Sequence, residues 1–319
     1  MNVELYIESD GICYKPVVES GIEWTTVRKA TPSKLTFRVV QDSILAIREG
    51  SAVRLTVDGV NLFYGFIFTR KRNKEALVEI TAYDQLRYLN NSDTYVYTSK
   101  TAADLLKMIV SDFQLNMGMV EDTSYIIPKK AESNKSLFDI IQNALDETLL
   151  NTGKMYCLYD EFGTLCLKSI ESMKVGILVD AQSGQNYDYS SSIDSDVYNQ
   201  IKLTFDNETT GKRDVYMAKD TGTINQWGIL QYYDTLKEGE NGQVKADALL
   251  KYYNRVARKL KVSGVVGDSR VRAGCLIGVK LDLGDVKVQN WMLCEKVTHT
   301  FHHQEHTMDL TLIGGDFVA

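Results

Sequence analysis

The chain has 319 residues, of which 44% are hydrophobic and 24% charged, the balance of an ordinary soluble globular protein. This length is enough for two or three domains. The formal net charge of −6 argues against nucleic-acid binding, because such binding rests on Lys and Arg side chains that neutralise phosphates. No apolar run approaches the ~20 residues of a membrane span, and the N-terminus lacks the basic and apolar regions of a signal peptide. We therefore expect synthesis in a cytoplasm, with no nucleic-acid or membrane partner.

Residues 1–97 are predicted to form an N-terminal β-barrel. Hydrophobic and polar residues alternate over 34–39 and again over 53–58, as they do in half-buried strands. The Asp58-Gly59 pair that follows is a strong hairpin turn signal. Roughly six strands with such alternation predict an antiparallel sandwich or a small barrel.

A hairpin of one aromatic strand, 62–68, and one alternating strand, 76–82, is the most distinctive part of this region. Asp84, just after it, is predicted to cap one helical turn. Gly65 lies inside the aromatic strand, where Gly marks a bulge or the close approach of another backbone. Neighbouring side chains of a strand face opposite sides, so one row is predicted to lie in the core and the other at an interface. The charged loop 70–75 is either a docking patch for an acidic partner or a solvated hairpin tip. The candidate interface residues are Phe63, Tyr64, Phe66, Arg70 and Arg72.

Residues 98–180 are predicted to form a small α+β domain of two helices and a hairpin. Apolar residues recur at helical spacing over 105–113, after a capping box that begins at Thr101. A second helix is expected over 136–153, and a hairpin over 155–170. The apolar stripes of both helices are interpreted as core packing.

Residues 181–319 are predicted to form a second β-barrel with a helix inserted near 242–260, on which Val244 and Leu249 are expected to face inward. The Ser-, Gly- and Asp-rich stretch 181–196 is interpreted as a linker or surface loop. The order of turn, strand, aromatic strand, polar loop and strand in 48–81 recurs in 272–311. The repeat predicts a β-rich α+β fold, with two similar antiparallel β-barrels separated by the α+β domain.

The octapeptide Ala-Tyr-Asp-Gln-Leu-Arg-Tyr-Leu at 82–89, with the strand and charged loop before it, resembles baseplate hub proteins of contractile phage tails. The segment resembles in particular the XkdQ type, found in PBSX-like prophages and in phage-tail-like bacteriocins of Gram-positive bacteria. The Tyr-Asp-x-x-Gly turn at 159–163 and the Tyr-Asn-x-Ile-Lys segment at 198–202 are similar to the same family.

This resemblance implies a structural protein located in the baseplate of a virion or tail-like particle. It implies a homotrimer whose partners are the tail tube protein, the central spike and other baseplate proteins. Two barrels in each chain would let a trimer present six similar units, which would match a threefold assembly to a sixfold tube. Two alternatives stay open: a tail-associated cell-wall hydrolase, and a carbohydrate- or peptide-binding β-module that uses exposed aromatic residues.

No sequence motif indicates an active site. The chain contains no Gly-x-Ser-x-Gly motif, no Gly-rich phosphate loop and no HExxH motif. All four histidines lie within 299–306, where the alternation of a strand would prevent three of them from converging on a metal. A polar hairpin loop is therefore preferred to a metal site here. We expect no catalytic residue, no cofactor and no bound metal.

The five cysteines include one pair that the predicted hairpin brings together. A turn at 160–163 would place Cys157 across from Cys166 on paired strands. Because the bacterial cytoplasm is reducing, two free thiols are expected rather than a disulfide.

Overall fold

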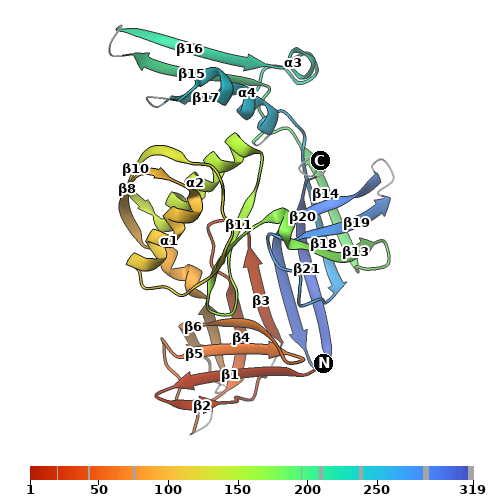
Figure 1. Cartoon of the computed structure of the whole chain (residues 1–319). Helices are drawn as coiled ribbons and strands as arrows, with labels where there is room; N and C mark the ends of the chain where they lie inside the picture. Colours follow the sequence, from red (N-terminus) through yellow and green to blue (C-terminus); the bar gives the residue numbers. More distant parts are fainter. Residues whose placement is uncertain are drawn as a thin grey trace. The chain divides into compact units, whose positions relative to one another are not determined.

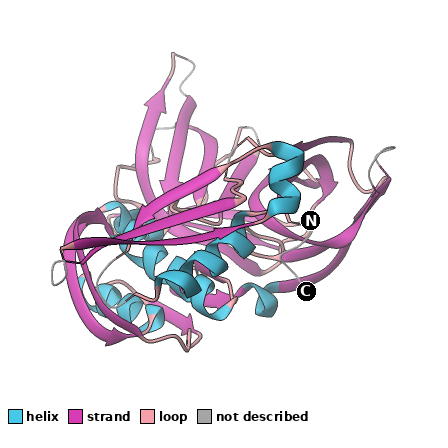
Figure 2. Cartoon of the chain, turned by 90° about the horizontal axis from the view of Figure 1, so that it is seen from above, coloured by secondary structure: helices cyan, strands magenta, loops and turns pink. Residues whose placement is uncertain are grey.

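A computed structural model of the chain describes residues 1–19, 21–41, 44–74, 77–194, 196–207, 211–236, 240–282 and 287–314. It is rich in β-strands, as predicted, and helices are a minority (Figure 2). The chain divides into two compact units: unit 1 comprises 1–148, 154–188 and 260–319, and unit 2 comprises 149–153 and 189–259. Within the described ranges, no helix combines the length and apolar character that crossing a bilayer requires.

Unit 1 is built around one large sheet in which strands from both ends of the chain are neighbours (Figure 1). The strand order is β14-β18-β21-β20-β3-β4-β7-β6-β5-β1-β2, and β19 pairs with both β20 and β13. The bounds are β1 (Val3–Ser9), β2 (Ile12–Tyr14), β3 (Ile22–Val27), β4 (Lys34–Val40), β5 (Ala52–Val57), β6 (Val60–Arg72), β7 (Leu77–Tyr83), β13 (Lys174–Asp180), β14 (Asn186–Ser192), β18 (Ala257–Val266), β19 (Leu276–Asp282), β20 (Lys287–His302) and β21 (Glu305–Ile313).

The antiparallel pair of β3 and β20 joins the two ends of the chain. Trp24 on β3 lies opposite His299 on β20, and their rings stack with centroids 4.9 Å apart. Phe301 from β20 is buried in the same core as the strands before residue 83. The strands of the two predicted barrels that belong to unit 1 therefore form one open sheet, which differs from the two closed barrels predicted. Sequence alternation sets which side chains face inward but does not show which strands are neighbours.

The predicted repeat corresponds to two three-stranded antiparallel meanders. The first is β5-β6-β7, and the second is β19-β20-β21. In both, the long central strand pairs with the strands before and after it. Residues 283–286, between β19 and β20, lie outside the described residues.

A small α+β region of unit 1 contains a helical core. Its elements are η1 (Gln85–Asn90), β8 (Ser92–Lys100), α1 (Ala102–Asp112), β9 (Met117–Val120), β10 (Ile127–Ser136), α2 (Leu137–Thr152), β11 (Tyr156–Asp160), β12 (Leu165–Ser169) and η2 (Ile170–Met173). The predicted capping box is present, because Thr101 and Asp104 each accept the other's backbone N–H. The apolar stripes of both helices are buried in one core, which confirms their interpretation as packing residues. Strands β8 and β10 pair, and β12 lies between β11 and β9.

Unit 2 is a three-stranded sheet with two helices. Its elements are β15 (Gln200–Asn207), β16 (Lys212–Lys219), α3 (Thr221–Trp227), β17 (Gln231–Thr235) and α4 (Gly242–Tyr253). The predicted helix 242–260 is too long, because α4 ends at Tyr253 and β18 begins at Ala257. Val244, which was expected to face inward, is 60% exposed, and Ala246 and Leu249 supply the buried face. The predicted linker 181–196 contains strand β14.

Candidate interaction surface at the 82–89 motif

The aromatic strand of the predicted hairpin is β6, and its side chains form two rows. Phe63 is 2% exposed and belongs to the core of the large sheet. Tyr64, Phe66 and Phe68 alternate with buried positions and are half-buried on the opposite side. The ring centroids of Tyr64 and Phe66 are 5.7 Å apart. Among the candidate aromatic residues, Tyr64 and Phe66 are therefore the two on the outer row.

Gly65 is required by the close approach of a neighbouring strand. A Cβ at this position would lie 2.2 Å from the backbone oxygen of Tyr83 on β7, which confirms the close backbone approach inferred from the sequence. The β6–β7 register also shifts just beyond this point, between Ile67 and Thr69. Only a residue without a side chain lets β6 and β7 keep this spacing.

The basic residues after the aromatic strand belong to β6 rather than to a loop. Strand β6 continues through Arg72, and Arg70 lies opposite Ile80 of β7. The Arg70 guanidinium donates to both carboxylate oxygens of Glu49 at 3.2 Å and to the backbone oxygen of Ile47. Arg72 is exposed. Residue 75, the last of the predicted loop, and residue 76, the first of the predicted strand, lie outside the described residues.

The turn after β7 is the helical turn that the sequence predicts. Asp84 caps η1, because its Oδ1 accepts the backbone N–H of Leu86 at 3.1 Å. Its Oδ2 accepts the backbone N–H of Ser33 at 3.2 Å. Asp84 is only 2% exposed, so both of its carboxylate oxygens accept hydrogen bonds in a buried environment. A negatively charged or polar cap is stabilising at a helix start because the first N–H groups have no helical acceptor.

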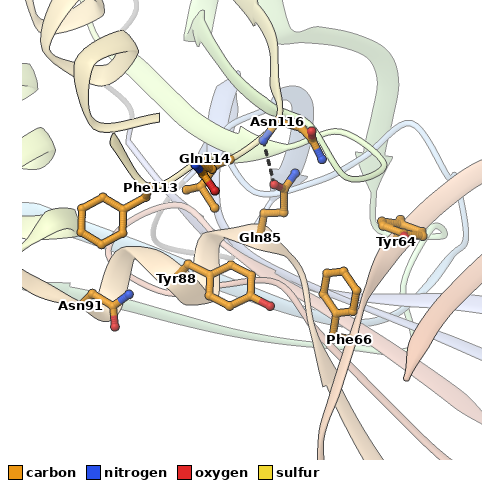
Figure 3. Close-up of a pocket in the computed structure, with 9 residues that line it drawn as sticks. Tyr64, Phe66, Gln85, Tyr88, Asn91, Phe113, Gln114 and Asn116 are labelled. Carbon is orange, nitrogen blue, oxygen red and sulfur yellow. Dashed lines mark hydrogen bonds between the residues drawn. The ribbon is translucent and has the colours of Figure 1, made fainter. Parts of the chain in front are cut away.

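Gln85 joins the two sequence motifs that resemble the hub family. Its Nε2 donates to the backbone oxygen of Gly163 in the Tyr-Asp-x-x-Gly turn. Its Oε1 accepts the backbone N–H of Asn116 at 2.9 Å (Figure 3). Segments near residues 85, 116 and 163 are thus held together by one buried carboxamide. The shared position of the two motifs indicates that part of their sequence serves to assemble this corner of unit 1.

Two buried carboxylates and one arginine lie beside this carboxamide. Asp160 is 5% exposed, and its Oδ1 accepts the backbone N–H of Gly163 at 2.7 Å. Arg272 donates from Nη2 to the backbone oxygen of Asp160 at 2.8 Å, and its guanidinium lies 4.2 Å from the centre of the Tyr159 ring. Asp160 Oδ2 and Arg272 Nε have no hydrogen-bond partner among the described residues.

Burial raises the pKa values of both carboxylates. The pKa of Asp160 rises from 3.8 to about 6, chiefly because the charged form loses its hydration, while Gly163 and Arg272 oppose the shift. The pKa of Asp84 lies well above its usual range for the same reason, and the charge of Asp160 raises it further. Two carboxylates with one arginine therefore favour binding of a proton in mildly acidic solution.

Replacing Asp160 with asparagine is expected to change how stability depends on pH. Between about pH 4 and 6 the folded state holds a proton on Asp160 that the unfolded state has released, so the free energy of unfolding falls as pH rises through this window. The variant lacks this contribution, on the order of 2–3 kcal/mol. Urea unfolding of both proteins across this range measures it; parallel pH profiles would contradict the assignment. Asparagine keeps an oxygen that can accept from Gly163.

A pocket of about 480 Å³ opens next to Gln85. Figure 3 shows Tyr88 in its middle, Tyr64 and Phe66 on one side, and Phe113 and Asn91 on the other. Three segments supply the lining, namely β6, the motif with η1, and the turn after α1. The lining residues are Tyr64, Phe66, Gln85, Tyr88, Asn91, Phe113, Gln114, Leu115 and Asn116. None of them carries a charge at neutral pH.

The histidine segment forms a hairpin with two histidines inside it. Strand β20 ends at His302 and β21 begins at Glu305, so the observed loop is shorter than a loop over 300–306. His299 donates from Nε2 to the backbone oxygen of Val271 at 2.8 Å, so its Nδ1 accepts from His306 Nε2 at 2.9 Å. Burial lowers the pKa of His299 to about 3. Within the described ranges, no three His, Cys, Asp or Glu residues converge as metal ligands.

The cysteines are all free thiols in the structure. Cys157 lies opposite Lys168, and Cys166 lies opposite Tyr159, so the two cysteines are diagonal neighbours rather than the directly opposed pair predicted. Burial raises the pKa of the Cys157 thiol to about 11, which keeps it protonated and unreactive.

Several residues of this surface were not identified from sequence. Arg272 contacts Asp160 from 112 residues further along the chain, and no local pattern predicts that pairing. A signal for Asp84 and Asp160 did exist, because each lies within a segment that resembles the hub family. The turn 113–116 follows a helix and carries no pattern that would distinguish it from an ordinary connection.

Comparison with known proteins supports the resemblance over nearly the whole chain. The sequence profile of the YQBQ-like family matches residues 22–313. The chain belongs to the YQBQ-like family. The PBSX phage-like element protein XkdQ of Bacillus subtilis (strain 168) is 29% identical to this YQBQ-like chain over 321 residues, covering 98% of this chain and 97% of XkdQ.

Solved structures show that this YQBQ-like chain has the fold of phage tail proteins. The 43 kDa tail protein of prophage MuSo2 from Shewanella oneidensis superposes with a TM-score of 0.73 at 12% identity, covering 99% of this chain and all of that protein. An Escherichia coli component of the type VI secretion system gives a TM-score of 0.57 at 10% identity, covering 99% of this chain and 78% of that one. That component is described as structurally similar to the T4 bacteriophage tail proteins gp27 and gp5.

Proposed function

We propose that this protein is a structural baseplate hub of a contractile phage tail or tail-like bacteriocin, which joins the tail tube to the central spike or tail tip. The observation that carries the proposal is that nearly the whole chain matches both XkdQ of the PBSX phage-like element and the fold of a prophage tail protein. The type VI secretion component with a similar fold is described as similar to gp27 and gp5 of T4, which supports the placement in the baseplate. Its work is mechanical joining, not catalysis.

The two meanders supply a physical basis for symmetry matching. Each chain contains β5-β6-β7 and β19-β20-β21, two copies of one strand arrangement. A homotrimer would therefore present six similar surfaces to a sixfold tube. In this proposal each meander is the main part of one barrel-like domain, at 1–97 and 181–319, with the α+β domain of 98–180 between them. Tyr64, Phe66 and Arg72 are proposed to face partner chains.

The solution mass tests the assembly state. Size-exclusion chromatography with light scattering is expected to give three times the 36.0 kDa chain mass, either alone or after addition of the tube and spike proteins. A monomer that joins neither partner would contradict the hub role. Peptidoglycan degradation by the purified protein would favour the hydrolase alternative instead.

A further inference from the structure

The pocket beside η1 holds several polar groups that unit 1 leaves unused. The hydroxyls of Tyr64 and Tyr88 and the side-chain amides of Asn91, Gln114 and Asn116 make no hydrogen bond with any described residue. Gln85, in contrast, donates to Gly163 and accepts from Asn116. Phenols and carboxamides can both donate and accept, so the free groups suit a ligand that offers alternating N–H and C=O groups.

The pocket leads directly into an exposed strand edge. Its last lining residue, Asn116, is followed by β9, and β9 is the edge strand of its sheet with β12 as its hydrogen-bonded neighbour. Met117 and Met119 on β9 are 48% and 61% exposed. An edge strand presents backbone groups for pairing with another chain, and methionine adapts to varied apolar partners.

We infer that the pocket and the edge of β9 together form a docking site for an uncharged, extended segment of a second tail protein. The segment pairs with β9 and places an apolar side chain among Tyr64, Phe66 and Tyr88. Its main-chain N–H and C=O groups bond to the free carboxamides. This mode of recognition combines main-chain hydrogen bonds for affinity with a side-chain pocket for specificity. The inference rests on the proposed function, because it takes the partner to be a tail protein.

Two observations favour a neutral peptide over other ligands. The lining contains no charged side chain, so a charged segment would be desolvated without compensation. The rings of Tyr64 and Phe66, on one side of the pocket, are inclined to each other at 74°. Inclined rings enclose a compact apolar side chain, whereas a sugar needs one flat ring face on which to stack.

The probe is a set of short overlapping peptides. Together they cover the sequences of the other structural proteins of the same tail. Binding to the full chain is measured by fluorescence anisotropy, with a neutral chito-oligosaccharide as a separate ligand. At least one peptide is expected to bind, and Tyr88→Ala and Met119→Lys are each expected to weaken it by roughly tenfold or more. A lysine at position 119 opposes pairing of a second strand with β9, because it places a charge on the strand edge.

Matched substitutions outside the site separate docking from loss of fold. Tyr187→Ala removes a tyrosine that is 50% exposed, and Val96→Lys adds the same charge at a strand residue that is 62% exposed. Both are expected to bind the peptide as the parent does, and circular dichroism checks that all four variants are folded.

Three outcomes would overturn the docking site: no peptide binding at millimolar concentration, equal binding by site and control variants, or binding of the saccharide alone at Tyr88. The hub role is judged separately. A chain that joins the tube without binding any peptide would overturn the docking site only. A chain that binds the peptide but never enters a tail assembly would overturn the hub role only.

Discussion

Replacing Arg272 with methionine is expected to lower the free energy of unfolding of unit 1 by about 3–5 kcal/mol at neutral pH. Arg272 is the cation beside the buried carboxylates Asp84 and Asp160, and it also bonds to the backbone oxygen of Asp160. Methionine fills a similar volume but leaves these acidic groups without a counter-charge. Urea unfolding followed by far-UV circular dichroism measures the loss.

The loss is expected to shrink on acidification. Near pH 5, below its raised pKa of about 6, Asp160 binds a proton, so less charge is left uncompensated in the variant. Arg270→Met is the matched control, because Arg270 is two residues away and pairs with Asp268 on the surface. That change should cost much less, because water screens an exposed ion pair. Equal losses for Arg270 and Arg272 would show that the buried cluster contributes nothing specific.

Replacing Gly65 with alanine is expected to destabilise unit 1 by about 3 kcal/mol or more. The new Cβ would lie 2.2 Å from the backbone oxygen of Tyr83 and 2.7 Å from the Phe63 ring. A rotating side chain could move away, but a backbone oxygen in a paired strand moves only if β6 and β7 separate. Thermal and urea unfolding report the change.

Gly176→Ala serves as the control for this substitution. Gly176 also lies in a strand of the large sheet, yet no atom is within 4 Å of a Cβ placed there. Its replacement should be neutral or stabilising by up to about 1 kcal/mol, because alanine restricts the unfolded chain. If both alanine variants unfold alike, the close approach at Gly65 has no energetic consequence.

Local features of this fold were predictable from sequence. The β6–β7 hairpin, the cap at Asp84, and the helix stripes after Thr101 each depend on residues within one or two turns of each other. Their side-chain periods and capping chemistry are therefore visible in a short window. The same reasoning identified Gly65 as a point of close approach.

The features that sequence did not predict depend on distant pairs. The bond between Thr25 and Thr298 joins positions 273 residues apart, and no local pattern distinguishes one open sheet from two barrels. The pocket likewise needs three segments to meet. The sequence pointed to Tyr64 and Phe66 on β6 and to the motif 82–89, but no pattern predicted that the turn 113–116 lies beside them. Val244 was misplaced because a helix period shows a stripe but not whether another element covers it.

The pairing of β3 with β20 has a consequence for how the chain is made. Thr25 leaves the ribosome long before Thr298 exists, since the intervening 273 residues take roughly 14–55 s at 5–20 residues per second. During that interval β3 has no β20 beside it, and the Trp24 ring has no His299 on which to stack. Until β20 is made, β3 has one unpaired edge that can pair with other nascent chains. The protein therefore depends on late closure of its sheet, and its yield in cells should be sensitive to chaperones that shield such edges.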